Sequence, residues 1–170
     1  GIDKWKIERI RAGDWWQITT IPKDGNVDNK AFWCGDELID MYPANIDNIL
    51  VLKDLFPIDL SKSFGAMVIF STWYNISEGD LGTLEISEDG NLWQVIGSYS
   101  GDSNGWITDS TDITSWIGGD IVIRFRFTSD NSIENKGWYI DDVKVVAMLD
   151  YDPPDTTCNL AGTMGENNWY

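Results

Sequence analysis

The sequence contains no histidine among its 170 residues. Histidine is the general base of Ser-His-Asp and Cys-His systems, a zinc ligand in HExxH sites, and a ligand of non-haem iron. Its absence excludes all of these chemistries from this chain. An enzyme built on this sequence would have to work with carboxylates alone, as many glycosidases do.

Cysteine is scarce, with only Cys34 and Cys158, far apart in the chain. One pair is too little to define a disulfide framework. Cys34 lies between aromatic and glycine residues in an expected strand, which favours a buried free thiol. A Cys34–Cys158 bridge is the alternative. Long apolar runs are also missing, and without about 18 consecutive apolar residues we expect no membrane span.

Positive charge is in short supply. Twelve Lys and Arg stand against 28 Asp and Glu, which gives a formal net charge of −16. Such a surface repels phosphate backbones, so we expect no nucleic-acid partner. The excess carboxylates have two explanations: they keep the protein soluble, or some of them gather around Ca²⁺, which prefers oxygen ligands.

Strand periodicity is the dominant pattern that the sequence does contain. The segment 119–128 shows it most clearly, with one apolar face and one face that is mostly polar. The first face holds Ile121, Ile123, Phe125 and Phe127, and the second holds Val122, Arg124 and Arg126. Alternation of this kind predicts a half-buried strand with a solvated cationic face.

Strand signals recur about every 8–12 residues, the spacing found in sandwiches and jelly rolls. The expected strands are 3–10, 14–20, 30–34, 66–74, 82–87, 91–100, 105–108, 119–128 and 137–147, with an extended segment at 48–60 and a helical turn at 111–117. The sequence therefore predicts an all-β jelly-roll β-sandwich of two mainly antiparallel sheets over residues 1–148. Residues 149–170 are predicted to be a linker and the truncated start of a following module.

Two adjacent carboxylates, Asp141 and Asp142, interrupt the last expected strand. Strand alternation places Asp141 on the same face as Val143, and an unpaired carboxylate that faces a core costs several kcal/mol. One explanation is a Ca²⁺ site in which Asp36 or Asp47, from acidic loops, joins these two residues. In the other explanation, Asp141 lies at the rim of the sheet and accepts backbone hydrogen bonds.

Ten tryptophans suggest a second kind of site. If exposed, Trp15, Trp16 and Trp106 could stack on sugar rings. In most β-sandwiches such rings pack in the core, and we expect that here. The segment Ser87–Trp93 is similar to the S-x-D-x-G-x-x-W Asp-box turn of sialidases but lacks one residue of its spacing. Because Asp boxes are structural turns, we give this segment no functional weight.

An ordered series of motifs spans residues 3–147. It consists of Phe32-Trp33-Cys34-Gly35-Asp36, Tyr42-Pro43, Ile58-Asp59-Leu60, Trp73-Tyr74, Ser87-Glu88-Asp89-Gly90 with Trp93, Ile123-Arg124-Phe125-Arg126-Phe127 and Gly137-Trp138-Tyr139-Ile140-Asp141-Asp142-Val143. This series resembles the MAM-like jelly-roll domain attached to immune-inhibitor-A-type secreted metallopeptidases and other prokaryotic surface proteins. The tail from Pro153 onward resembles the first strand of an Ig-like repeat.

The resemblance implies a galactose-binding/MAM-like sandwich that accompanies a catalytic or adhesive module, without the peptidase's zinc motif. It also implies a cation that ties the first strand to the last, with Asp141 as a ligand. We therefore expect a non-catalytic extracellular accessory domain, structural or adhesive and stabilised by Ca²⁺. Its partners would be other domains of the parent protein, glycans or cell-surface proteins. The alternatives are a carbohydrate-binding module and, more remotely, a carboxylate-only glycosidase.

Overall fold

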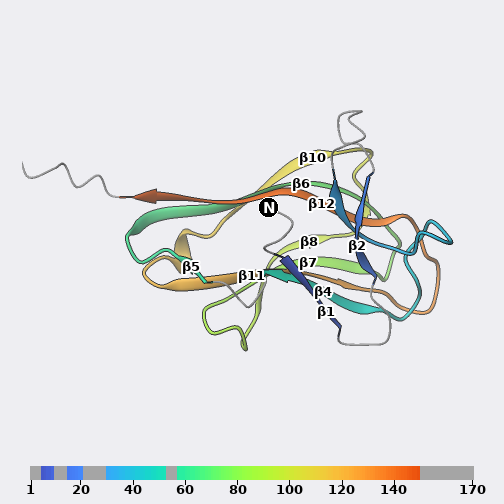
Figure 1. The fold of residues 1–170 in the computed structure, drawn as a ribbon, viewed down its shortest axis with the longest axis horizontal. Helices are drawn as coiled ribbons and strands as arrows, with labels where there is room; N and C mark the ends of the chain where they lie inside the picture. The colour runs from blue at the N-terminus through green and yellow to red at the C-terminus, as the bar shows by residue number, and fades with distance from the viewer. Residues whose placement is uncertain (1–4, 10–14, 21–29, 53–56, 150–170) are drawn as a thin grey trace, which may run out of the picture.

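The computed structural model describes residues 5–9, 15–20, 30–52 and 57–149. These residues form two antiparallel sheets packed face to face (Figure 1), which confirms the predicted all-β sandwich. The elements are β1 (Trp5–Arg9), β2 (Trp16–Thr19), β3 (Ala31–Cys34), β4 (Asp47–Leu52), β5 (Ile58–Asp59), β6 (Ser63–Ile76), β7 (Leu81–Ser87), β8 (Gln94–Tyr99), β9 (Gly101–Asp102), β10 (Ile107–Asp112), the 3-10 helix η3 (Thr114–Trp116), β11 (Asp120–Thr128) and β12 (Gly137–Leu149).

The two sheets exchange strands in the manner of a jelly roll. The first sheet has the order β1-β4-β11-β7-β8, with β5 added to β11. The second has the order β10-β6-β12-β3-β2, with β9 added to β6. Strands far apart in the chain, such as β4 and β11 or β3 and β12, are therefore neighbours, as in Greek-key connections.

The core between the sheets is largely aromatic. Phe125 and Phe127 of β11 are fully buried, as their alternation with the arginines predicted. The Phe125 ring lies 5.1 Å from Phe70, 5.6 Å from Trp138 and 5.8 Å from Trp5, measured between centroids. The four rings come from four different strands, two in each sheet, so this cluster joins the layers.

The segment before β11 differs slightly from its prediction. The strand expected at 105–108 begins at Ile107 and runs to Asp112. The helical turn expected at 111–117 is η3, which is only three residues long. The Asp112 carboxylate accepts a hydrogen bond from the Thr114 N–H at 2.8 Å, which fixes the start of this turn.

A bulge in β12 overturns the predicted orientation of Asp141. Asp141 pairs with Ser71, but the next paired residue, Lys144, pairs with Ile69, so β12 contains one extra residue. Asp142 takes a left-handed φ of +50° at this point. The extra residue inverts the alternation of side chains, so Asp141 and Val143 do not share a face. The prediction that Asp141 faces inward, which assumed regular alternation, is therefore wrong.

Three rings stack on the outer face of the second sheet. Tyr139 of β12 lies between Trp33 of β3, at 5.4 Å and 3°, and Trp73 of β6, at 4.9 Å and 16°. The Trp33 Nε1–H donates to the Lys136 carbonyl at 2.7 Å. Trp106 packs edge-on against Tyr139 at 6.2 Å. These rings stabilise the outside of the sheet rather than the space between the layers.

Cys34 is buried and carries a free thiol, whose pKa is raised by burial, in agreement with the favoured prediction. Cys158 and the predicted linker beyond Leu149 lie outside the described residues. Within the described part of the chain, no helix has the length and apolar character needed to cross a membrane.

Candidate functional site

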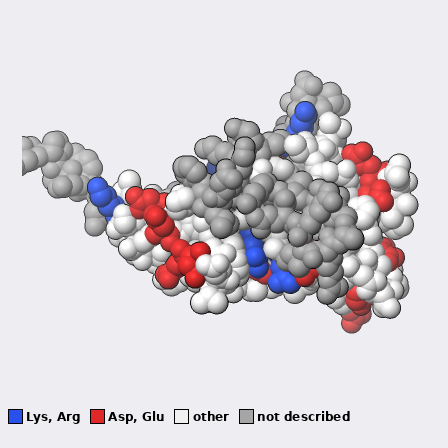
Figure 2. All heavy atoms as spheres, turned by 60° about the horizontal axis from the view of Figure 1, so that its bottom comes forward, with Lys and Arg blue, Asp and Glu red and all other residues white. Residues whose placement is uncertain are grey.

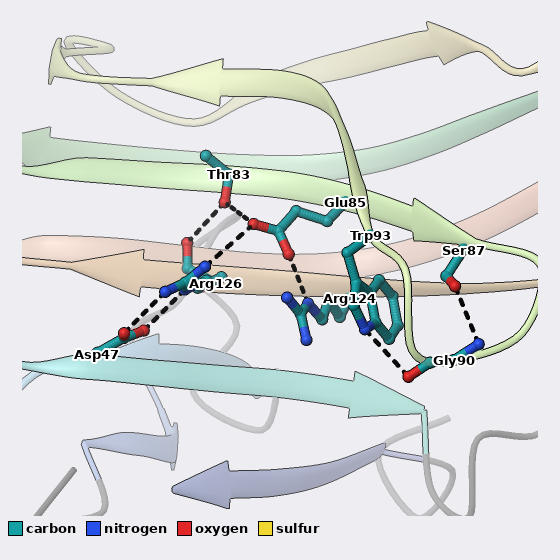
Figure 3. A network of polar contacts seen from close by, with 8 residues as sticks. All are labelled: Asp47, Thr83, Glu85, Ser87, Gly90, Trp93, Arg124 and Arg126. Atoms are coloured by element: carbon teal, nitrogen blue, oxygen red, sulfur yellow. Dashed lines mark hydrogen bonds and ion pairs between the residues drawn. The ribbon is translucent and has the colours of Figure 1, made fainter. Parts of the chain in front are cut away.

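A row of charged side chains crosses the outer face of the first sheet (Figure 3). Asp47 of β4 accepts two hydrogen bonds of 2.8 Å from the Arg126 guanidinium of β11. Glu85 of β7 accepts one from Arg124 Nε at 2.5 Å and lies 3.9 Å from Arg126 Nη1. We call these four residues the charged row. Opposite charges alternate along it because they pair across neighbouring strands.

The charged row is less solvated than its sequence predicted. The Arg124 side chain is only 13% exposed and that of Glu85 only 5%, whereas Arg126 is 33% exposed. The two arginines do face outward as predicted, but a solvated cationic face is wrong for Arg124. Its guanidinium lies 4.0 Å from the centroid of the Trp93 ring, so a carboxylate and an indole both exclude water from it.

The turn from Ser87 to Trp93 holds that indole in place. Asp89 Oδ1 accepts the N–H groups of Asn91 and Leu92, each at 2.8 Å. Ser87 Oγ accepts the N–H of Gly90 at 2.9 Å, and Trp93 Nε1–H donates to the Gly90 carbonyl at 3.1 Å. The backbone N–H donors lower the pKa of Asp89 to about 2. This turn is ordered by its own side chains, as an Asp-box-like turn should be.

An open pocket of about 330 Å³ lies beside this turn. It is lined by Glu88, Asp89, Leu92, Trp93, Gln94 and Trp116. Trp116 comes from η3, which precedes β11, and the pairing of Val122 with Ser87 brings the start of β11 next to the end of β7. Strand register therefore places two tryptophans that are 23 positions apart in sequence around one hollow.

The structure does not bring the four predicted metal ligands together. Asp47 is paired with Arg126, and this carboxylate raises the pKa of the guanidinium. Asp36 accepts the N–H of Leu38 at 2.9 Å inside its own loop. Among the residues that the structure describes, no group of three or more His, Cys, Asp or Glu side chains could hold a metal ion.

Asp141 and Asp142 line a different hollow, of about 250 Å³, between β1 and the bulge of β12. Its other lining residues are Trp5, Lys30, Phe32, Val143 and Lys144. The Asp142 N–H donates to Asp141 Oδ1 at 2.8 Å. This position, between the first and last described strands, is where the family resemblance implied a cation.

The three tryptophans considered for sugar stacking are not exposed. Trp16 is fully buried in the core, at 5.9 Å from Trp138. Trp15 is partly buried and packs against the core. Trp106 is half-buried against Tyr139. Trp16 thus lies in the core and Trp15 packs against it, as expected, whereas Trp106 lies on the outer face of the second sheet instead.

Sequence reasoning missed the pair of tryptophans in the 330 Å³ pocket. The Asp-box-like spacing of Ser87–Trp93 was the available signal for Trp93, but it was interpreted only as a turn. No local signal points to Trp116, because its position next to Trp93 depends on the pairing of β11 with β7.

The surface of the molecule is predominantly acidic. Figure 2 shows Asp and Glu side chains gathered toward both ends of the visible face, with a few Lys and Arg atoms near its middle, at its left edge and at its top. The formal net charge of −16 makes this surface unfavourable for anionic ligands.

No known family model matches the sequence. The chain is similar to part of bacillopeptidase F of Bacillus subtilis (strain 168), at 29% identity over 132 residues, which are 76% of this chain and 9% of that protein. It is also similar to pre-pro-metalloprotease PrtV of Vibrio cholerae serotype O1, at 21% identity over 101 residues, 52% of this chain and 11% of the relative. The chain thus spans about a tenth of the length of these curated relatives.

Solved structures show the same fold. The K2 cleaved adhesin domain of Lys-gingipain has a TM-score of 0.56 at 16% identity, covering 84% of this chain and 88% of that one. The K1 domain from Porphyromonas gingivalis W83 has 0.55 at 19%, covering 85% and 90%. TmCBM61, solved with β-1,4-galactotriose, has 0.55 at 13%, covering 84% and 88%.

The fold and these comparisons define the class: a two-sheet β-sandwich domain similar in fold to protease adhesin domains and a carbohydrate-binding module. Within that class, the chain has partial sequence similarity to two peptidases, bacillopeptidase F and PrtV, whose remaining length it does not cover.

Proposed function

We propose that this chain is a non-catalytic, MAM-like accessory domain, structural or adhesive, of a larger extracellular protein. The observation that carries the proposal is the size of the match: a compact sandwich that corresponds to 9% and 11% of two peptidases. The absence of histidine supports it, because the chain cannot supply a zinc-protease motif or a Ser-His-Asp triad. Partners would be other domains of the parent protein and a surface component.

The direct test is to assay the purified chain for hydrolysis of casein and of a panel of glycosides and polysaccharides. We expect a protein that unfolds cooperatively and hydrolyses none of them. Turnover of a glycoside that disappears in Glu88→Gln or Asp142→Asn, with the fold retained, would instead establish the carboxylate-only glycosidase.

A structural Ca²⁺ in the hollow between β1 and β12 is part of this proposal. Asp141 and Asp142 would hold it, since both line the hollow. Ca²⁺ takes 6–8 oxygen ligands, so backbone carbonyls and water would have to complete the shell. Lys30 and Lys144 line the same hollow, and their positive charges disfavour a bound cation. The effect of EDTA on the Tm therefore decides whether Ca²⁺ binds here.

Glycan binding is the second candidate function. The observation that favours it is the pocket bounded by Trp93 and Trp116, which combines two indoles with amide and carboxylate groups. Ligand sites of proteins are typically hollows lined by apolar and aromatic side chains with a few polar groups that fix orientation.

A further inference from the structure

We propose that the pocket between Trp93 and Trp116 binds one neutral sugar unit of a glycan, and that Trp93 is its stacking platform. This inference rests on glycan binding, the second candidate function, and does not depend on the accessory role. The segment Ser87–Trp93, which its sequence predicted to be only a structural turn, supplies most of the pocket.

The platform is prepared before any ligand arrives. Ser87 and Asp89 order the turn before Trp93 by accepting the N–H groups of Gly90 and Leu92, and the Trp93 Nε1–H donates to the Gly90 carbonyl. Arg124 lies against the ring at 4.0 Å and is itself held by Glu85. A guanidinium can cover only one face of an indole, so Arg124 does not by itself cover the whole Trp93 ring, which also lines the pocket.

Trp116 is the second aromatic residue that lines the pocket. It packs partly against the core, so its position is fixed by the sandwich and not by a loop alone. Trp93 and Trp116 both line this pocket, which therefore offers a ligand two indoles from different parts of the chain. At about 330 Å³ the pocket is at the small end of the roughly 300–1,000 Å³ of typical ligand sites.

The polar groups decide the ligand class. A sugar ring presents C–H bonds on its faces, which suit the negative face of an indole, and hydroxyls around its edge. Gln94 is exposed at the pocket and can both donate and accept, while Glu88 and Asp89 are acceptors for hydroxyl groups. Two carboxylates on a chain of net charge −16 repel uronic acids, sulfated sugars and sialic acid. The ligand is therefore a neutral saccharide.

The experiment is calorimetric titration of the chain with neutral trisaccharides, cellotriose and β-1,4-galactotriose among them, and with polygalacturonic acid as the anionic comparison. We expect a dissociation constant of about 1 mM or tighter for at least one neutral probe and no binding of polygalacturonate. Trp93→Phe, Trp116→Ala and Gln94→Ala should each weaken binding, with a loss of at least about tenfold for Trp116→Ala.

Trp106→Ala is the matched control, because Trp106 is also half-buried but belongs to the second sheet. It should leave the affinity unchanged. Gln94→Ala changes an exposed side chain and should leave the unfolding midpoint unchanged, so its effect on affinity cannot come from misfolding. Absence of binding by the folded chain at about 10 mM of every neutral probe, or binding that only Trp106→Ala removes, overturns the proposal. Neither result affects the non-catalytic accessory role.

Discussion

Replacing Arg124 by methionine tests whether the charged row is an interior feature of this sheet or a surface one. Arg124 and Glu85 are 13% and 5% exposed and are joined by a 2.5 Å hydrogen bond. Removing one partner of such a pair leaves an uncompensated buried charge, which costs about 3–5 kcal/mol. Arg124 also loses its contact with Trp93, worth about 1 kcal/mol. Glu85 keeps the Thr83 hydroxyl at 3.0 Å and Arg126 Nη1 at 3.9 Å, which partly compensate its charge. We therefore expect Arg124→Met to lower the free energy of unfolding by about 3–4 kcal/mol, less than the sum of these two terms.

The double variant Arg124→Met/Glu85→Met removes both charges and fills the space with apolar groups. Its loss of unfolding free energy should be about 2–3 kcal/mol smaller than the sum of the losses in the two single variants. The assay is urea denaturation followed by tryptophan fluorescence, in which 3 kcal/mol shifts the midpoint by about 1–3 M. Lys62→Met, at an exposed lysine, is the control and should change stability by less than about 0.5 kcal/mol. If Arg124→Met costs no more than Lys62→Met, or the two single losses simply add, then the charged row is a surface ion pair and our reasoning about burial is wrong.

Three further predictions concern other sites. Tyr42→Phe removes the donor to the buried Asp80, an O–H···O bond of 2.5 Å, and should cost about 1–3 kcal/mol in urea denaturation. The pKa of Asp89 is lowered to about 2, so its stabilising effect is present above about pH 4 and is lost as the pH falls toward 2; the difference in Tm between the wild type and Asp89→Asn should shrink over that range. Ca²⁺ at about a hundred times its Kd should add roughly 2.7 kcal/mol, so EDTA should lower the Tm by several degrees in the wild type and in Asp36→Asn but not in Asp141→Asn.

Each of these predictions has an outcome that contradicts it. A Tyr42→Phe protein as stable as the wild type would mean that Asp80 finds another donor. A Tm difference for Asp89→Asn that stays constant from pH 5 to pH 2 would show that the turn does not depend on the ionised carboxylate. Identical melting curves in EDTA and in millimolar Ca²⁺ would end the calcium proposal and leave Asp141 as a hydrogen-bonded structural residue.

The sequence by itself determined the fold class and the buried face of β11. Alternation is a local property, because successive side chains of a strand point to opposite faces whatever the strand pairs with. Phe125 and Phe127 could therefore be assigned to the core before any partner strand was known. The lack of histidine likewise excluded whole classes of catalysis without any knowledge of the fold.

Only the tertiary structure decided where the charged and aromatic side chains find partners. One extra residue in β12 inverted the predicted face of Asp141, because parity arguments fail at a bulge. Burial of Arg124 needs Glu85, 39 positions away, and Asp47 is occupied by Arg126, 79 positions away. The pocket of Trp93 and Trp116 exists because β11 pairs with β7 in a particular register. Such pairings depend on strand order and register, which the periodicity of a single strand does not contain.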